Sequence, residues 1–202
     1  MSAPPVRAAD VTMRIRGAPY DGSSWTLHGD LDGDDFYFWV EGIWGTASDD
    51  LYAVGWMSIG VEAQIHHFDG DSWQSVEPFP VKPTLRDVFG FSSDDVVAVG
   101  SSGLITQFDG QFWHVNEFGD MTFYGVWGSG SDDIFAVGER GAIFHFDGTE
   151  WTVMSAEGPF VVDMQAVWGT APDNVYIGGA FAQILHYDGS EIRLEHQLIN
   201  TN

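Results

Sequence analysis

The sequence predicts an all-β protein built from a repeated unit of four short antiparallel strands, and three observations lead to this prediction. Short apolar runs alternate with clusters of Gly, Asp, Asn and Ser, which are turn residues. A run of four apolar residues between turns suits a buried strand, because a helix needs about 10–12 residues. The pattern also returns after about 38–45 residues, the length of one supersecondary repeat.

The clearest copy of the repeat runs from Val126 to Trp151, and we name its four expected strands a to d. They are expected at residues 126–128, 134–137 and 142–146 and from Trp151 onward. An Asp-Asp pair marks the a–b turn, and Asp147-Gly148 marks the c–d turn, for which we expect a type I′ hairpin with positive φ at both positions. One such sheet leaves both of its apolar faces uncovered, so it needs neighbours of the same kind.

The repeat occurs four times in full, and its second half occurs once more near the N-terminus. Strand a ends at a glycine in each full copy, at Gly45, Gly90, Gly128 and Gly169. The c–d turn occurs five times, beginning at Asp21, Asp69, Asp109, Asp147 and Asp188. The a–b and c–d turns keep a constant length, whereas the b–c and d–a connections vary. Both variable connections lie at the same end of a meander, and repeat proteins usually place insertions on the binding face.

These residues resemble the repeats of β-propellers. The pattern V-W-G, D-D, A-V-G and D-G-x-x-W is similar to short propeller repeats of large bacterial surface and secreted proteins. It is more distantly similar to WD-repeat, Asp-box and photosystem II assembly-factor propellers. The resemblance covers about residues 13–198. It implies a β-propeller of four complete four-stranded blades plus an N-terminal partial blade of strands c and d, and it suggests an extracellular or surface location.

The composition of the chain indicates its domain organisation and excludes some classes of binding partner. Residues 1–10 are predicted to be a disordered lead without the apolar core of a signal peptide, and residues 11–202 a single propeller domain. Seven Lys and Arg against thirty Asp and Glu give a net charge of −23, which argues against binding nucleic acid or anionic membranes. The chain has no Cys, hence no disulfide or thiolate metal site, and no apolar run long enough to span a membrane.

Recurring polar and aromatic residues are interpreted as parts of the blades. Three histidines stand two residues before the Asp of a c–d turn, at His67, His145 and His186. Equivalent positions in different blades are too far apart to share a metal ion, so we expect a hydrogen-bond network within each blade, as in WD-repeat proteins. The repeated tryptophans, among them Trp127 of strand a, are expected to pack between blades, and the turn aspartates to cap their own turns.

One acidic segment is a candidate cation site. Asp30, Asp32 and Asp34 offer oxygens at alternate positions, and Glu41 follows eleven residues after the first of them, as in a calcium loop. However, Gly33 takes the fourth place of the segment, where an EF-hand has its glycine at the sixth, and strands are expected to flank it. A solvated acidic loop is therefore the alternative. We predict no required cofactor, with Ca²⁺ as the candidate ion.

We find no catalytic motif, neither a nucleophile elbow nor H-E-x-x-H, and predict a non-enzymatic module that binds a protein or a glycan. Contact residues are expected in the variable b–c and d–a loops, at Trp56, Met57, Phe118, Phe123, Arg140 and Phe181. One alternative is a glycan-active hydrolase or lyase, which a carboxylate of raised pKa near the ring axis would favour. Another is a structural protomer that assembles into a larger ring. Counting the strands slightly favours a monomer over a ring-forming oligomer.

Overall fold

A computed structural model of the chain describes residues 38–57, 62–76, 83–154 and 162–196. Within these ranges the strands form four four-stranded antiparallel sheets, each a meander in chain order. We call these sheets blades I to IV. The chain divides into two compact units, residues 1–85 and 86–202, so that blade I belongs to the first and blades II to IV to the second. The predicted partial blade at residues 13–27 lies outside the described residues.

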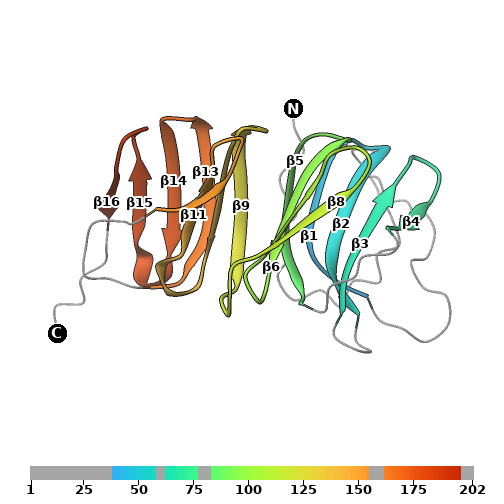
Figure 1. Cartoon of the computed structure of the whole chain (residues 1–202), viewed down its shortest axis with the longest axis horizontal. Helices are drawn as coiled ribbons and strands as arrows, with labels where there is room; N and C mark the ends of the chain where they lie inside the picture. Colours follow the sequence, from blue (N-terminus) through green and yellow to red (C-terminus); the bar gives the residue numbers. More distant parts are fainter. Residues whose placement is uncertain (1–37, 58–61, 77–82, 155–161, 197–202) are drawn as a thin grey trace, which may run out of the picture. The chain divides into compact units, whose positions relative to one another are not determined.

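Each blade contains the four strands expected from the repeat, in the order a to d (Figure 1). Blade I contains β1 (Phe38–Ala47), β2 (Asp50–Met57), β3 (Glu62–Phe68) and β4 (Trp73–Ser75). Blade II contains β5 (Leu85–Ser92), β6 (Asp95–Gly100), β7 (Leu104–Phe108) and β8 (Trp113–Glu117). Blade III contains β9 (Phe123–Gly130), β10 (Asp133–Gly138), β11 (Ile143–Phe146) and β12 (Trp151–Val153), with the short 3₁₀ turn η1 (Glu139–Gly141). Blade IV contains β13 (Met164–Ala171), β14 (Asn174–Gly179), β15 (Ile184–Tyr187) and β16 (Ile192–His196), with η2 (Ala180–Ala182).

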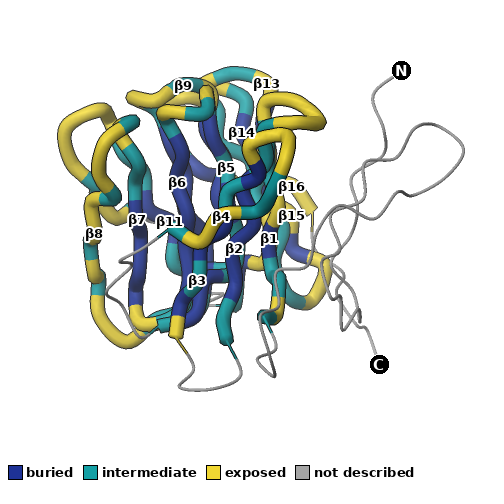
Figure 2. Tube along the Cα trace, turned by 90° about the vertical axis from the view of Figure 1, so that its right-hand side faces the viewer, coloured by how far each residue is buried: buried dark blue, intermediate teal, exposed yellow. Residues whose placement is uncertain are grey.

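Strand b is the most deeply buried strand of blades II and III, which explains why its sequence is apolar at every position. In β6 and β10 every residue after the first is buried. Both faces of these strands are covered, so side chains that alternate between the two faces all enter an apolar environment. Buried positions gather in the middle of the strands, and the turns at their ends are exposed (Figure 2).

Two apolar clusters join the three blades of the second unit. Ile134, Ala136 and Phe144 of blade III pack against Val97 and Ile105 of blade II. The other face of blade III supplies its buried side chains to a cluster with blade IV, whose members are Val137, Ile143, Met164, Ile177, Leu185 and Ile192. Each blade therefore covers a face that its neighbour could not cover alone.

Gly128 and Gly169 lie inside β9 and β13, which continue past the expected end of strand a, and each leaves room for an aromatic side chain of the preceding blade. A Cβ atom on Gly169 would lie 2.6 Å from the indole of Trp127, and one on Gly128 would lie 2.5 Å from the ring of Phe91. These contacts confirm the prediction that Trp127 packs between adjacent blades. Between blades III and IV, the tryptophan of one W-G pair therefore packs against the glycine of the next.

The c–d turns differ from the expected type I′ hairpin. Only the glycine of each Asp-Gly pair has a positive φ, between 86° and 94°, at Gly70, Gly110, Gly148 and Gly189. The connection is a four-residue turn closed by the aspartate itself, as in blade III, where Asp147 Oδ1 accepts hydrogen bonds from the backbone N–H groups of Thr149 and Glu150. The hairpin type was therefore wrong, and the interpretation of these aspartates as turn caps is confirmed.

Candidate functional site

The b–c turns of the second unit share one backbone shape and display different side chains. The second residue after strand b lies in the left-handed region in each of the three blades, with φ of 57° at Ser102, 57° at Arg140 and 56° at Phe181. In blades III and IV the turn is closed by the same backbone bond, from Gly138 N–H to the Ala142 carbonyl and its equivalent one blade later. A left-handed residue other than glycine costs on the order of 1 kcal/mol. Its occurrence at the same position in three successive blades marks these turns as unusual.

Arg140 and Phe181, two of the predicted contact residues, are exposed on these turns. Phe181 is 76% exposed, and Arg140 is also exposed. The backbone N–H of Arg140 donates a hydrogen bond of 2.9 Å to the Asp163 carboxylate, which fixes the turn while leaving the guanidinium out of that bond. A large apolar side chain and a cation thus occupy equivalent places on neighbouring blades.

The other predicted contact residues are placed differently from what the sequence suggested. Trp56 and Met57 were expected in a b–c loop, but they belong to strand β2, which continues past Gly55, and they pair with β1 and β3. The Trp56 indole stacks on Trp39 with ring centroids 5.5 Å apart. Phe123 is fully buried in the core between blades II and III and is not available to a ligand. Phe118 is half-buried and packs on Phe144 at 5.1 Å.

The candidate calcium site is only partly described. Asp30, Asp32 and Asp34 lie outside the described residues. Glu41 lies in β1, where its carboxylate accepts a hydrogen bond of 3.1 Å from the Trp56 indole N–H. In the ranges that the structure describes, no three His, Asp or Glu side chains are gathered as a metal site requires. Helices long and apolar enough to cross a membrane are likewise missing from those ranges.

The recurring histidines form the expected hydrogen-bond networks within their own blades. In blade III the Ser129 hydroxyl donates to the Asp133 carboxylate, whose other oxygen lies 2.7 Å from His145 Nε2. The same arrangement holds in blade I and, with an asparagine in the middle, in blade IV, formed by Thr46, Asp50, His67, Thr170, Asn174 and His186. The hydroxyl bonds the carboxylate and not the imidazole, unlike a nucleophile activated by a histidine. We interpret these networks as structural ties between the a–b turn and strand c.

In blade I, burial raises the pKa of the Asp50 carboxyl, but the hydrogen bonds from His67 and Thr46 outweigh it and hold that pKa below the ordinary value. The carboxylate therefore stays ionised at neutral pH and accepts both bonds.

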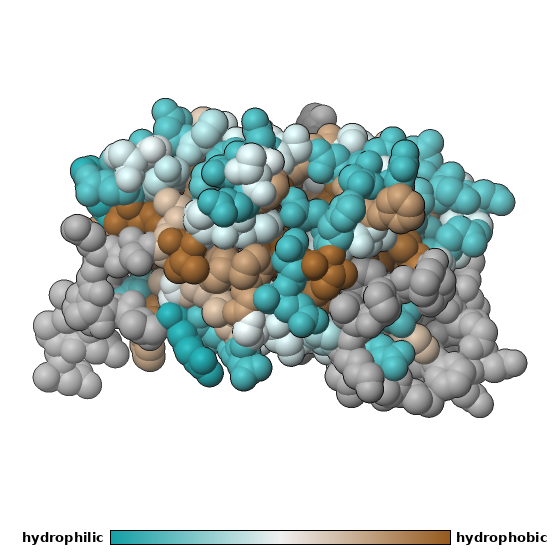
Figure 3. Space-filling view, in the orientation of Figure 1, coloured by the Kyte–Doolittle hydropathy of each residue, from teal (hydrophilic) through white to brown (hydrophobic). Residues whose placement is uncertain are grey.

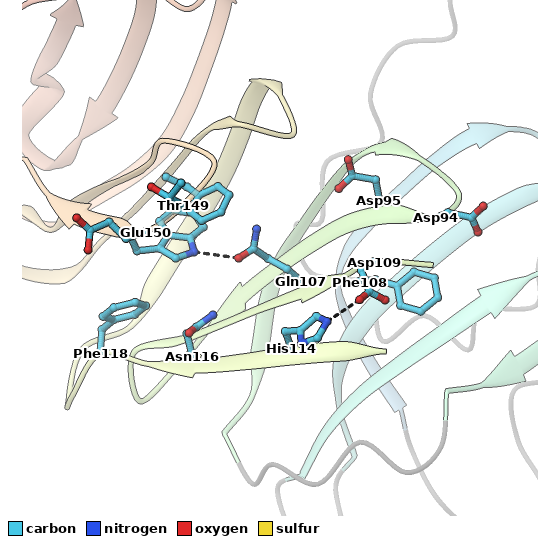
Figure 4. Close-up of a pocket in the computed structure, with 12 residues that line it drawn as sticks. Asp94, Asp95, Gln107, Phe108, Asp109, His114, Asn116, Phe118, Thr149 and Glu150 are labelled. Atoms are coloured by element: carbon cyan, nitrogen blue, oxygen red, sulfur yellow. Dashed lines mark hydrogen bonds and ion pairs between the residues drawn. The ribbon is translucent and has the colours of Figure 1, made fainter. Parts of the chain in front are cut away.

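Blade II departs from this network and forms a groove with blade III instead. Phe91 and Gln107 stand where the other blades have a Ser or Thr and a His. The Gln107 side-chain oxygen accepts a hydrogen bond of 3.0 Å from the Trp151 indole N–H of blade III. Beside this bond a groove of about 720 Å³ opens along the outer strands of the two blades (Figure 4). Its lining joins aromatic rings to carboxylates, with Phe108, Phe118, Phe146 and Trp151 among the former and Asp94, Asp95, Asp109 and Glu150 among the latter.

The carboxylates of the groove have different environments. The Asp109 carboxyl accepts hydrogen bonds from His114 and from the backbone N–H groups of Phe112 and Gln111, which lower its pKa to about 2. Burial raises the pKa of Asp95, partly offset by a hydrogen bond from Ser131 of blade III. Asp94 and Glu150 are exposed at the rim. Figure 3 shows hydrophilic side chains along the upper edge of the face in view and apolar side chains across its middle.

Asp87 in β5 is a carboxylate that sequence reasoning did not single out. Burial raises its pKa to about 6, although its two oxygens accept hydrogen bonds from the backbone N–H groups of Val88 and Val126, at 2.9 and 3.0 Å. The second of these bonds ties blade II to blade III. A raised pKa is one sign of a catalytic acid, but here both oxygens are directed to backbone amides, and Asp87 does not line the groove. We interpret it as a link between blades.

Comparisons with known proteins agree with this architecture. No family model matches the chain, and no curated protein matches it in sequence. Among solved structures, the one described as "Structure of U3-55K" has a TM-score of 0.62 at 10% identity, covering 86% of this chain and 56% of that chain. The "WD40 beta propeller domain of Doa1" has a TM-score of 0.55 at 12% identity, covering 72% of this chain and 49% of that chain.

The fold is a β-propeller. The four sheets confirm the predicted complete blades, and the neighbours support a distant WD-like propeller. The chain spans about half the length of the solved structures it matches. At such low identities the likeness shows the fold alone. The suggested kinship with bacterial surface repeats and Asp-box propellers therefore stays a prediction.

In the sequence, the groove and Asp87 are marked only by residues of blade II that depart from the repeat. Gln107 and Phe91 break a pattern that three other blades keep, and Asp87 stands where blades I, III and IV have Gly42, Gly125 and Ala166. A departure from a repeat shows that a blade differs, but it does not show which neighbour the new side chain reaches. That information depends on the packing of two blades.

Proposed function

We propose that the chain is a non-catalytic module that binds a protein partner through the b–c turns of blades II to IV. The observation that carries the proposal is the constant left-handed turn with a different side chain in each blade, at Ser102, Arg140 and Phe181. A fixed backbone with variable side chains separates the scaffold from recognition, as in other loop-based binding sites. WD40 domains are the structural neighbours of the chain, and this is consistent with a scaffold for protein contacts.

The chemistry of these turns favours a protein over a glycan. Phe181 is a 76% exposed aromatic side chain beside the cationic Arg140 in a strongly acidic chain. Exposed aromatic residues and arginine are enriched at the energetic centres of protein interfaces. A partner surface with an apolar pocket and a nearby carboxylate would complement them.

The test compares two variants that remove an exposed phenylalanine from opposite ends of the blades. Phe181→Ser alters a b–c turn, whereas Phe112→Ser alters a c–d turn at a residue that is 66% exposed. We expect proteins captured from the native source to be lost with Phe181→Ser and with Arg140→Ser and retained with Phe112→Ser. Equal capture by all variants would contradict the proposal, and selective binding on a glycan array would favour the glycan instead. An extracellular or surface location stays a prediction.

A further inference from the structure

The groove between blades II and III combines an aromatic floor with an acidic rim and contains no Lys or Arg among its lining residues. Trp151 is held by its bond to Gln107, and Phe118 lies at the end of the groove near Asn116 (Figure 4). Asp94, Asp95 and Glu150 approach it from the turns. This surface is suited to a cation, because carboxylates attract it by charge and the faces of Trp and Phe rings attract it through their quadrupoles.

Blade IV shows which cation satisfies such a turn. There Arg193 of strand d lies with Nη1 3.3 Å from the Asp188 carboxylate, and its Nη2 contacts the Glu191 carboxylate. In blade III the same position is Thr152, which carries no charge, while Asp147 and Glu150 keep the two acidic positions. The acidic c–d turn of blade IV is therefore paired with the guanidinium of Arg193. The equivalent turn of blade III, beside the groove, has Thr152 in place of this arginine.

The edge of blade II adds a backbone component. Strand β8 is the outermost strand of its sheet, so one side of its backbone has no partner within the sheet. Asn116 and His114 of this strand line the groove. An extended peptide can pair with such an edge and direct alternate side chains into the groove. A volume of about 720 Å³ is in the range of ligand pockets and admits several side chains.

From these observations we propose that the groove binds an extended peptide segment that places an arginine between the aromatic floor and the carboxylates of Asp95 and Glu150. The guanidinium contacts Glu150 as Arg193 contacts the equivalent Glu191 in blade IV, and a neighbouring aromatic or apolar side chain of the peptide contacts Phe118. An arginine fits better than a lysine, because its planar fork bonds carboxylates in pairs and stacks on rings. The site is independent of the b–c turns proposed above.

The test is fluorescence anisotropy with a labelled peptide that alternates arginine and phenylalanine, against peptides with lysine or glutamate in place of arginine. Two double variants carry the same change of charge. Asp95→Asn with Glu150→Gln alters the groove, and Asp133→Asn with Glu191→Gln alters the equivalent positions one blade later. We expect the groove variant to weaken binding about ten-fold, in keeping with the loss of two partly screened charge contacts, and the matched pair to leave it unchanged.

Several outcomes would overturn the proposal. No binding of the arginine peptide would do so, and so would equal losses in both double variants, which would show attraction to the overall charge of −23 only. Equal affinity for the lysine peptide would remove the role of the guanidinium. The variants Thr149→Lys and Ser190→Lys provide a second check, since only the first adds a cation to the groove and should compete with the peptide. Arg140→Ser with Phe181→Ser should bind the peptide normally, so a failure here is separate from a failure of the b–c turns.

Discussion

Trp127 and Trp168 occupy the same position in successive blades but have different surroundings. The Trp127 indole is half-buried against Gly169 of the next blade, with Phe89 and Phe135 at ring distances of 6.5 Å. Trp168 is 59% exposed. We expect Trp127→Ala to lower the free energy of unfolding by about 3 kcal/mol, because it leaves a cavity between two blades. Urea unfolding monitored by circular dichroism checks this value.

The control is Phe112→Ala, at a residue that is 66% exposed, for which we expect a loss below about 1 kcal/mol, as for surface substitutions in general. Equal losses at the two positions would contradict packing between blades as the role of this tryptophan. Gly169→Ala should resemble Trp127→Ala, since its Cβ would lie 2.6 Å from the indole and 2.9 Å from the Asn174 carbonyl.

The raised pKa of Asp87 predicts that the stability of the protein depends on pH. Its pKa rises from an ordinary value of 3.8 to about 6 because the carboxyl is buried. The folded protein therefore binds this proton more tightly than the unfolded chain does, so this group's contribution to stability falls as the pH rises from about 4 to about 6. A shift of about two pKa units corresponds to about 3 kcal/mol. We expect Asp87→Asn to remove this fall, although its single oxygen accepts only one of the two backbone bonds.

Chemical unfolding at pH 4, 5, 6 and 7 measures the effect, with Asp120→Asn at an exposed loop as the control. Parallel profiles for the wild type and Asp87→Asn would show that the carboxyl does not titrate in this range. The opposite sign holds for Asp109 and Asp147, whose pKa values are lowered to about 2 by hydrogen bonds to their carboxyls. Their contribution is present above pH 4 and is lost as the pH falls toward 2.

At the scale of the element, the Ser129–Asp133–His145 network connects the a–b turn to strand c. Blade IV has Asn174 at the place of Asp133 and keeps both contacts, with the amide donating to Thr170. We therefore expect Asp133→Asn to cost less than about 1 kcal/mol. Asp133→Ala leaves the hydroxyl and the imidazole without their common partner and should cost about 1–3 kcal/mol. Thermal melts of the two variants compare these losses, and equal destabilisation would contradict a hydrogen-bonding role.

Elements were predictable from the sequence where the repeat is regular and less so where it changes. The order of strands and the a–b and c–d turns follow from spacing that all copies share. Trp56 and Met57 were expected in a variable b–c loop, yet β2 extends through them, since Phe38 and Trp39 extend β1 and pair with them. The left-handed turns at Arg140 and Phe181 carry no glycine at that position, so no local signal announced their positive φ.

At the scale of the whole molecule, the calcium hypothesis is testable by its effect on stability. If Asp30, Asp32, Asp34 and Glu41 bind Ca²⁺, millimolar CaCl₂ should raise the melting temperature by mass action. The triple variant with Asn at the three aspartates should not respond. The comparison needs NaCl and MgCl₂ at matched ionic strength, because screening alone stabilises a chain with a net charge of −23. No specific effect of calcium would leave the solvated loop as the interpretation.

The last blade of the second unit presents an apolar face. Trp168, Tyr176 and Ile184 are 59%, 39% and 40% exposed, whereas Phe135 and Ile143 at the matching positions of blade III are fully buried. An apolar face of this kind favours association unless something covers it. The sequence holds five c–d halves but four a–b halves, so one strand pair at residues 13–27 is left over within the same chain. We therefore expect closure within one chain and a monomer.

Light scattering at several protein concentrations, for the wild type and for Trp168→Lys, tests this expectation. A monomer at every concentration, with Trp168→Lys also monomeric, supports closure within the chain. A dimer or larger ring that persists on dilution and separates in Trp168→Lys would show that a second copy covers the face instead. The expected monomer would then be wrong. The alternative function, a structural protomer that assembles into a larger ring, would gain support, because a second copy and not the same chain would cover the apolar face.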